Sequence, residues 1–385
     1  MKRAAEVVII GGGCMGASVA YHLARRGVTD VVLVERDALL GTGSTGRNAG
    51  GVRHQFSNEA NIRLSIESIG VLERFADEVG QPIDFHQDGY LFLLSTPASV
   101  ATFRQNAALQ RSLGVDVQWL DPQDAARLAP GLDVDGALGA TFCQRDGIAD
   151  PNGVTMGFAR AAQLAGVSIE RDTEVTGIRV ASGRVAAVET TRGTIATERL
   201  ALAVAGHSSH VVAMAGITLP IETHVLQAMV SDPVKPVLDT VVTSGAVHFY
   251  ISQSDKGELV MGGDLDFMNS YAQRGNLPIV EHVVGACLTL FPTFGRMKLM
   301  RTWGGICDMT MDGSPIIAKL PVQGLYMTGG WCYGGFKATP ASGFLLAHTI
   351  ARDAPHELNA AFTLERFAQG RMIDEKGAGP YPWHH

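Results

Sequence analysis

The feature that most constrains this chain is a glycine-rich turn between an apolar run and a helical pattern near the N-terminus. Val7–Ile10 is β-branched and apolar, which is typical of a fully buried strand. Three glycines follow directly in the spacing G-x-G-x-x-G: Gly11, Gly13 and Gly16. After the predicted helix, a second buried strand at Val31–Val34 ends at Glu35. Together these segments predict a βαβ unit within a parallel sheet.

This unit supplies the contacts that a dinucleotide requires. The first glycine permits the tight turn, the second lets the backbone approach a pyrophosphate, and the third allows close helix–strand packing. The helix N-terminus adds N–H donors and a positive dipole. At the end of the second strand, a carboxylate accepts from both ribose hydroxyls and would repel a 2′-phosphate. The predicted dinucleotide contacts here are Gly11, Gly13, Cys14, Met15, Gly16, Glu35 and Arg36.

The segments beyond this unit favour FAD over NAD. A polar loop at 41–51 replaces the further βα repeats usual in NAD enzymes, and it is similar to the loop that wraps the pyrophosphate and flavin in flavoproteins. A second glycine cluster comes after the last apolar strand, where another helix N-terminus would suit a negatively charged reduced flavin. An NAD-dependent dehydrogenase is the rival interpretation. The further predicted FAD contacts are Ser44, Thr45, Asn48, Ala49, Gly50, Gly51, Val175, Ala205, Gly206, Gly330, Gly334, Gly335, Phe336 and Lys337.

Composition excludes several other classes of protein. With 46% hydrophobic and 18% charged residues, the chain can bury a large core and is not intrinsically disordered. A net charge of −7 without any basic run argues against nucleic acid and anionic membranes as partners. No apolar stretch approaches the roughly 20 residues that a membrane span needs. Five scattered cysteines predict no thiolate metal site and a reducing compartment, so we expect a cytoplasmic protein without a metal.

The order of predicted elements indicates two domains in a mixed α/β (α+β) chain of 385 residues. We expect a Rossmann-like FAD-binding domain with a parallel sheet, assembled from residues 1–85, 145–220 and 320–385. A mostly antiparallel substrate-binding domain, residues 86–144 and 221–319, is inserted between these pieces, because alternating strands such as His248–Ile251 and Glu258–Met261 replace the βα pattern. Helices are expected at 58–78, 97–114, 153–166, 279–290 and 336–352, and a strand at 200–205.

Several longer strings carry a family resemblance that spans nearly the whole chain. They are Ser252–Gly263, Asp308–Thr310, Asp312–Ile317, Gly334–Pro340, Leu364–Phe367, Gly370-Arg371 and Ile373–Glu375. In these strings the chain resembles the D-amino-acid-oxidase-like family of FAD amine oxidases. Within that family it is most similar to the β subunits of heterotetrameric sarcosine oxidases.

The resemblance implies FAD-dependent oxidation of a C–N bond in a secondary or N-methylated, sarcosine-like amino acid. The imine product would hydrolyse to an aldehyde or keto product, and partner subunits would complete a hetero-oligomer. Two alternatives stay open. One is the β subunit of a proline, hydroxyproline or opine dehydrogenase that passes electrons to cofactors of partner subunits. The other is a non-redox scaffold subunit that holds FAD.

The resemblance also assigns roles to single residues. Arg53 matches an arginine that forks onto the substrate carboxylate, a geometry that suits the planar guanidinium. Lys337 matches a lysine at a helix start that serves both the substrate carboxylate and the reduced flavin. We therefore predict Arg53 and Lys337 as catalytic and substrate-binding residues. Further predicted pocket residues are His54, His248, Tyr250 and Trp303.

Covalent attachment of a flavin is not expected. In sarcosine oxidase β subunits, a histidine just before the helix predicted at 153–166 carries a covalent FMN, whereas this chain has Pro151 there. FMN bound at a subunit interface stays an alternative. Monomeric relatives link FAD to a cysteine, but Cys307 lies two residues out of register with it and is expected to be a free thiol. The predicted cofactor is non-covalent FAD.

Overall fold

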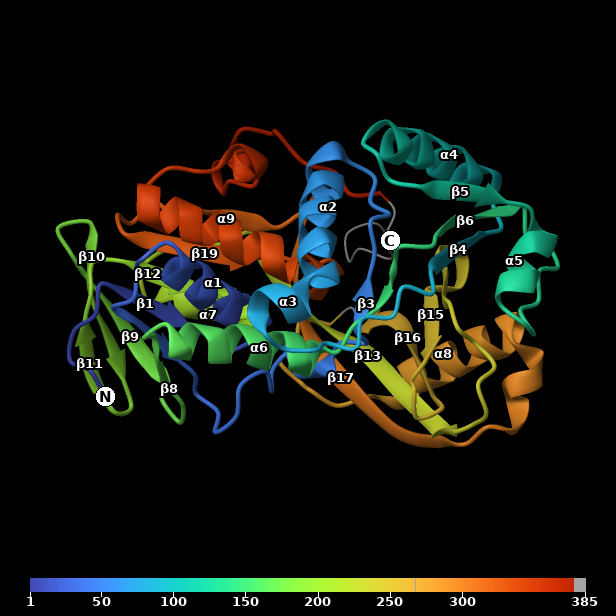
Figure 1. The fold of residues 1–385 in the computed structure, drawn as a ribbon, viewed down its shortest axis with the longest axis horizontal. Coiled ribbons are helices and arrows are strands. Elements are labelled where there is room, and N and C mark those ends of the chain that lie inside the picture. The colour runs from blue at the N-terminus through green and yellow to red at the C-terminus, as the bar shows by residue number, and fades with distance from the viewer. Residues whose placement is uncertain (267, 377–385) are drawn as a thin grey trace.

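The computed structural model describes residues 1–266 and 268–376, in which two large sheets lie side by side (Figure 1). The last part of the predicted segment 320–385, residues 377–385, lies outside the described residues. One sheet carries the glycine turn, and the other forms most of the second half of the molecule.

The first sheet has six strands, parallel except at one edge, where β18 runs antiparallel to β19. In spatial order they are β18 (Ile316–Lys319), β19 (Leu325–Gly329), β12 (Leu200–Leu202), β1 (Val7–Ile10), β2 (Val31–Val34) and β8 (Ser168–Glu170). The apolar residues of every strand but the edge strand β8 are buried, because both faces of the sheet are covered. The predicted parallel sheet is thus present.

The two faces of this sheet are covered by different structures. On one face, α1 (Cys14–Arg25) packs against both α6 (Pro151–Leu164) and α9 (Thr339–Arg352). On the other face lie α7 (Ser208–Ala213) and a three-stranded antiparallel meander. The strands of the meander are β9 (Val175–Ala181), β10 (Arg184–Thr190) and β11 (Gly193–Ala196).

The second sheet has eight strands and is antiparallel except between β14 and β4. In spatial order they are β17 (Leu299–Thr310), β13 (Ile221–Pro233), β16 (Glu258–Asp266), β15 (Phe249–Gln253), β14 (Val241–Ser244), β4 (Tyr90–Leu94), β6 (Gly139–Cys143) and β5 (Val117–Leu120). Helix α8 (Leu277–Leu290) packs on this sheet through an apolar cluster that includes Val283 and Leu290. Helices α4 (Pro97–Ser112) and α5 (Pro122–Leu128) flank the edge at β5 and β6.

A short ladder connects the two sheets: β3 (Gly51–Val52) pairs with β7 (Gly147–Ile148). Helices α2 (Glu59–Glu73) and α3 (Phe75–Val79) follow β3, and α10 (Glu365–Ala368) lies near the C-terminus. Single 3-10 turns complete the description: Thr45–Arg47, Ala205–His207, Gly245–Val247, Pro292–Arg296, Phe336–Ala338 and Glu357–Asn359.

Local capping explains where the helices begin. The side chain of Thr96 accepts from the N–H of Ser99 in a capping box ahead of Pro97, and Asn58 and Asn276 cap α2 and α8 through the same kind of side-chain acceptor. Asp150 accepts from the next two free N–H groups and starts α6 at Pro151, two residues before the predicted 153.

Three predicted elements differ from the structure by more than two residues or are divided. The helix expected at 58–78 is two helices separated at Arg74, whose backbone leaves the helical region. The strand expected at 200–205 ends at Leu202, because the chain turns at Ala205 with a positive φ of 45°. The helix expected at 336–352 begins as a 3-10 turn and becomes α-helical at Thr339.

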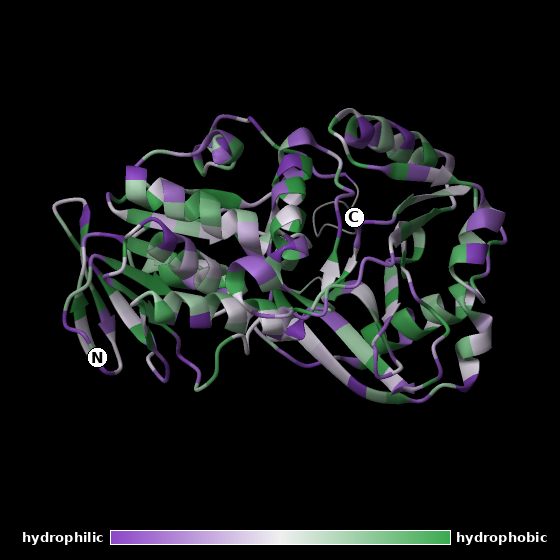
Figure 2. Ribbon diagram, viewed as in Figure 1, coloured by the Kyte–Doolittle hydropathy of each residue, from purple (hydrophilic) through white to green (hydrophobic). Residues whose placement is uncertain are grey.

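The predicted division of the chain into two domains stays a prediction, and β18 differs from it. This strand lies within 221–319, the segment assigned to the substrate-binding domain, yet it pairs with β19 in the parallel sheet. Figure 2 shows apolar residues concentrated on the strands and on the helix faces that cover them, with hydrophilic residues on the outer turns. Within the described ranges, no helix is both long enough and apolar enough to cross a bilayer.

Candidate functional site

The glycine turn forms one wall of a cavity of about 170 Å³. Gly11 has a φ of +108°, and a Cβ there would lie 2.3 Å from the carbonyl oxygen of Ala203. A Cβ at Gly16 would lie 1.9 Å from the carbonyl oxygen of Gly11, so both positions require glycine. The turn therefore brings bare backbone to the cavity, as a pyrophosphate site needs.

The polar groups around this cavity also fit an adenine dinucleotide. Gly13 is the N-cap residue of α1, and the Thr45 hydroxyl accepts from the N–H of Cys14 at 3.1 Å. Gly13 and Thr45 both line the cavity, so the positive end of this helix faces it. Glu35 lines the cavity and accepts from the N–H of Gly12 at 2.7 Å and from that of Asp37 at 2.9 Å. These two bonds hold a carboxylate acceptor at the end of β2, where the ribose of a bound dinucleotide would lie.

A larger cavity of about 520 Å³ continues from the smaller one toward the eight-stranded sheet. The two cavities share six lining residues: Met15, Ser44, Thr45, Ala205, Ile306 and Trp331. Helix α9 begins near this junction, and in its first turn the N–H of Ala341 donates to the Ser68 hydroxyl at 3.2 Å. The arrangement suits a long ligand with an anionic middle in the glycine turn and a flat aromatic end in the larger cavity.

Arg53 lies in the wall of the larger cavity and is only 6% exposed. Its guanidinium carbon is 4.9 Å from the ring centre of Phe56, 5.7 Å from that of Tyr90 and 5.6 Å from that of Phe92. Its Nε and Nη2 have no hydrogen-bond partner among the described residues. A buried guanidinium held by aromatic faces and lacking a carboxylate partner is suited to receive a carboxylate from a ligand.

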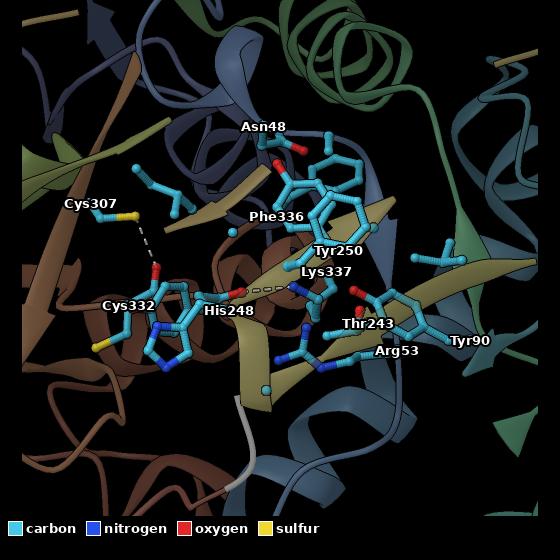
Figure 3. A pocket seen from close by; sticks show the side chains of 18 of the residues that line it. Asn48, Arg53, Tyr90, Thr243, His248, Tyr250, Cys307, Cys332, Phe336 and Lys337 are labelled. Carbon is cyan, nitrogen blue, oxygen red and sulfur yellow. Dashed lines mark hydrogen bonds between the residues drawn. The ribbon is translucent and has the colours of Figure 1, made fainter. Parts of the chain in front are cut away.

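Lys337 lies in the same wall, just before α9, and is also 6% exposed. Figure 3 shows its side chain beside that of Arg53, with Tyr250 and Tyr90 close by. The Nζ atom donates to the backbone carbonyl of Tyr333 at 2.8 Å. Burial, together with the positive charge of Arg53, holds the pKa of Lys337 well below its usual value of 10.5. An anion that binds here would favour the protonated form.

Another part of the cavity wall comes from neighbouring strands of the eight-stranded sheet. In the register of β14, Thr243 lies opposite Tyr250 on one side and beside Phe92 on the other, and all three line the cavity. Burial raises the pKa of the Tyr250 hydroxyl, so it stays protonated at neutral pH. Asp308 of β17 also lines the cavity, and burial raises its pKa to about 6, although the N–H of Gly330 donates to it at 2.5 Å.

Most of the residues predicted from the sequence meet at these two cavities. Around the smaller one are Gly11, Gly13, Met15, Glu35, Arg36, Ser44, Thr45, Val175 and Ala205. Around the larger one are Cys14, Met15, Ser44, Thr45, Asn48, Ala49, Gly51, Arg53, Ala205, His248, Tyr250, Gly335, Phe336 and Lys337.

Two predicted pocket residues line neither cavity, which corrects the expectation for both. His54 is buried behind the wall, where its Nδ1 lies 2.6 Å from a carboxylate oxygen of Asp146. Trp303 points its indole N–H at the carbonyl of Arg47 at 2.8 Å and thereby holds the polar loop against β17.

Five predicted glycines also line neither cavity: Gly16, Gly50, Gly206, Gly330 and Gly334. Their roles are local, in close packing or in turns. A Cβ at Gly206, for instance, would lie 2.0 Å from the Ile306 side chain.

Sequence reasoning missed part of the cavity wall. It did not single out Tyr90, Phe92, Phe103, Thr243, His207 or Asp308 as cavity residues. The alternating strand at His248–Ile251 was visible in the sequence, but the pairing of β14 with both β15 and β4 was not. Without that pairing, no local pattern shows that these side chains face Arg53.

Comparison with known proteins supports the interpretation of both cavities. The model of the DAO family, described as FAD dependent oxidoreductase, matches residues 6–349. The chain is 47% identical to the sarcosine oxidase subunit beta of Rhizobium meliloti (strain 1021), over 98% of this chain and 92% of that protein. It is 43% identical to the sarcosine oxidase subunit beta of an Arthrobacter species, over 98% and 94% of the two chains.

A solved structure agrees in fold. The L-proline dehydrogenase from P. horikoshii superposes with a TM-score of 0.91 at 30% identity, over 96% of this chain and 99% of that chain. The family match, the near-complete coverage of the relatives and the fit of the glycine turn to a dinucleotide agree with one another. This chain belongs to the DAO family of FAD-dependent oxidoreductases.

Proposed function

We propose that this protein uses FAD to oxidise the C–N bond of a small secondary or N-methylated amino acid such as sarcosine. The observation that carries the proposal is the pair of buried cations, Arg53 and Lys337, in a cavity continuous with the dinucleotide turn. A substrate carboxylate would satisfy the unpartnered guanidinium and offset the charge of both groups. The 47% identity to a sarcosine oxidase subunit beta supports the substrate class.

The chain's own residues bind and orient the substrate. Arg53 takes the carboxylate, and the rings of Phe56, Tyr90 and Phe92 keep water from the guanidinium, which strengthens the ion pair. Lys337 adds a second positive charge at the start of α9. FAD, when bound, accepts the hydride equivalent from the carbon next to the amine nitrogen, and this redox chemistry belongs to the cofactor.

The resulting imine is released to water, which hydrolyses it. With sarcosine, hydrolysis gives glycine and formaldehyde. With proline, the product is a cyclic imine and no small aldehyde is released. The product therefore identifies the substrate.

A product assay tests the proposal. FAD-loaded protein is incubated with sarcosine, N,N-dimethylglycine, proline or hydroxyproline and an artificial electron acceptor, and formaldehyde and cyclic imine are measured. We expect formaldehyde from the N-methylated acids. If none of the four acids gives either product, the proposed activity is wrong.

A second candidate is supported by the structural comparison. The fold agrees closely with that of an L-proline dehydrogenase, with a TM-score of 0.91. Cyclic imine from proline without formaldehyde from sarcosine would favour this candidate, in which electrons leave through partner subunits.

We infer that the cofactor is held without a covalent bond. Cys307 lines the larger cavity, but its thiol donates to the carbonyl of Cys332 at 3.5 Å, and burial together with the Asp308 carboxylate raises its pKa. The thiolate needed for attack on a flavin is therefore disfavoured. Pro151 at the first position of α6 leaves no histidine for an FMN linkage, so FMN would bind without a covalent bond at a subunit interface.

The same comparison and the cysteines support two further proposals, on partner subunits and on location. Two similar proteins are named as subunits, and we infer that this chain also assembles into a hetero-oligomer. All five cysteines are free thiols, which supports a place in the reducing cytoplasm.

Changing Glu35 to Gln tests the dinucleotide site. The substitution removes the charge that strengthens hydrogen bonds from ribose hydroxyls, while the amide oxygen can still accept from Gly12. We expect FAD to bind the apoprotein roughly tenfold more weakly, as measured by flavin fluorescence. Glu6→Gln, which changes an exposed acid paired with Arg199, is the matched control and should leave FAD affinity unchanged.

A further inference from the structure

A fully buried carboxylate lies behind the two cations, and the proposed function gives it no role. Asp146 is 0% exposed and lies between β6 and β7. In the β3–β7 ladder Val52 lies opposite Gly147, so Arg53 and Asp146 are the next residues along their strands. The carboxylate is therefore adjacent to the segment that carries the predicted carboxylate-binding arginine.

The hydrogen bonds of Asp146 fix the two residues that come after Arg53. Its Oδ1 accepts from the backbone N–H of His54 at 2.8 Å and lies 2.6 Å from His54 Nδ1. Its Oδ2 accepts from Gln55 Nε2 at 3.2 Å. These bonds hold the backbone from which the Arg53 side chain extends.

Gln55 extends this network into the eight-stranded sheet. Its Nε2 also donates to the carbonyl of Tyr90 at 2.9 Å, and its Oε1 accepts from the hydroxyl of Thr141 at 2.8 Å. Tyr90 is one of the three rings around the guanidinium. The network therefore fixes Arg53 relative to the aromatic side chains that surround it.

Asp146 also acts on the second cation through its charge. Among the groups that face Lys337, Arg53 disfavours the protonated amine, whereas Asp146 and Cys307 favour it. Asp308 of β17, Tyr250 of β15 and His248 line the same cavity. Asp146 is thus a buried negative charge placed against two buried cations.

A metal site is the alternative use for this cluster. His54, Cys143 and Asp146 bring three potential ligand atoms within 4.8 Å of one another. However, burial raises the pKa of Cys143, so the thiol keeps its proton, and metals bind the thiolate. The His54 ring nitrogen is already engaged by the carboxylate. The geometry favours a hydrogen-bonded pair over a metal centre.

We propose that Asp146 is a positioning residue for substrate recognition, which fixes Arg53 through its hydrogen bonds to His54 and Gln55. The charge of the same carboxylate acts on Lys337, and this effect provides the pH readout of the test. The inference rests on the proposed function, because it assumes that the two cations bind a carboxylate. When a substrate carboxylate binds, the positive charges of Arg53 and Lys337 face the negative charges of that carboxylate and of Asp146.

The test measures the binding of propionate to the FAD-loaded protein by calorimetry over a range of pH. The parent protein should bind propionate less tightly as the pH rises and Lys337 loses its proton. In Asp146→Asn the loss of the negative charge should move this fall in affinity about one pH unit toward acid. At a pH within the fall, the variant should bind propionate about tenfold more weakly than the parent protein.

Three further variants make the result specific. Asp146→Glu keeps the charge and should restore the midpoint of the parent protein. Asp312→Asn changes another buried carboxylate, paired with Arg366 at 2.7 Å, and should lower the Tm without moving the midpoint. Asp146→Ser also removes the charge and should give the same acid shift if the Asn variant does not fold.

Two results would overturn the inference. The first is a midpoint of the pH dependence that does not move in folded Asp146→Asn or Asp146→Ser. If these variants then lose the same affinity for propionate and for uncharged propionamide, Asp146 is merely structural. A parent protein that does not bind propionate would remove the carboxylate site and the proposed function with it. The first result leaves the proposed function standing, so the two failures are distinguishable.

Discussion

Replacing Arg53 by Ala should weaken the binding of carboxylate ligands by about 2–4 kcal/mol, or roughly 30- to 1000-fold. The reason is that Arg53 is 6% exposed, has two nitrogens without a hydrogen-bond partner in the described part of the chain, and lies among three aromatic rings. An ion pair formed there would be shielded from water and therefore stronger than one at the surface. The measurement is the Kd of propionate for FAD-loaded protein, set against the Kd of propionamide.

The control for this variant is Arg145→Ala, which removes an exposed arginine paired with Glu73. It should leave both ligands unaffected. Equal propionate affinity in Arg53→Ala and the parent protein would remove Arg53 from the site. An equal loss for propionamide would indicate a collapsed cavity instead of a lost ion pair.

Replacing Lys337 by Met should lower kcat/KM for the amino-acid substrate about 100-fold while FAD remains bound. Methionine fills a similar volume but supplies neither a charge nor a donor at the start of α9. Steady-state kinetics on protein of measured FAD content tests this expectation. Unchanged kinetics would refute the role of Lys337.

The same variant has a predicted signature in stability. Because burial lowers the pKa of Lys337 in the fold, the unfolded chain binds this proton more tightly than the folded chain does. The free energy of unfolding of the parent protein therefore rises with pH between the lowered pKa and the ordinary value of 10.5.

In Lys337→Met that rise should be absent, and at neutral pH the Tm of the apoprotein should exceed that of the parent protein. Thermal unfolding at several pH values measures both effects. Lys319→Met, which removes an exposed lysine paired with Asp353, is the control and should retain the rise with pH. A Tm in Lys337→Met that depends on pH as in the parent protein would show that the lysine is not buried with a lowered pKa.

Parts of the site that depend on neighbouring residues in sequence were predictable. The turn from Gly11 to Gly16 is set by local sterics, since a Cβ at either end would contact nearby carbonyl oxygens. The carboxylate of Glu35 follows from its place at the end of β2. Arg53 and Lys337 were assigned through the family resemblance, and the structure places both in one cavity.

Parts that depend on pairing between distant segments were not predictable. Asp146 and His54 are 92 residues apart, and only the β3–β7 ladder brings them together. For the same reason His54 was expected to face the pocket, whereas the carboxylate draws its ring away from it. The antiparallel edge strand β18 was assigned to the wrong domain because a short apolar segment does not show which sheet it joins. Its partner β19 begins six residues after β18 ends.

The most direct test of the proposed chemistry is anaerobic mixing of the FAD-loaded protein with an excess of sarcosine or proline. If the buried cation pair presents an amino acid to the flavin, the visible absorbance of the oxidised flavin should disappear with at least one of them. The loss should be slow or absent in Arg53→Ala. Persistence of the absorbance with every secondary amino acid tried, while FAD stays bound, would contradict this chemistry and support a scaffold role.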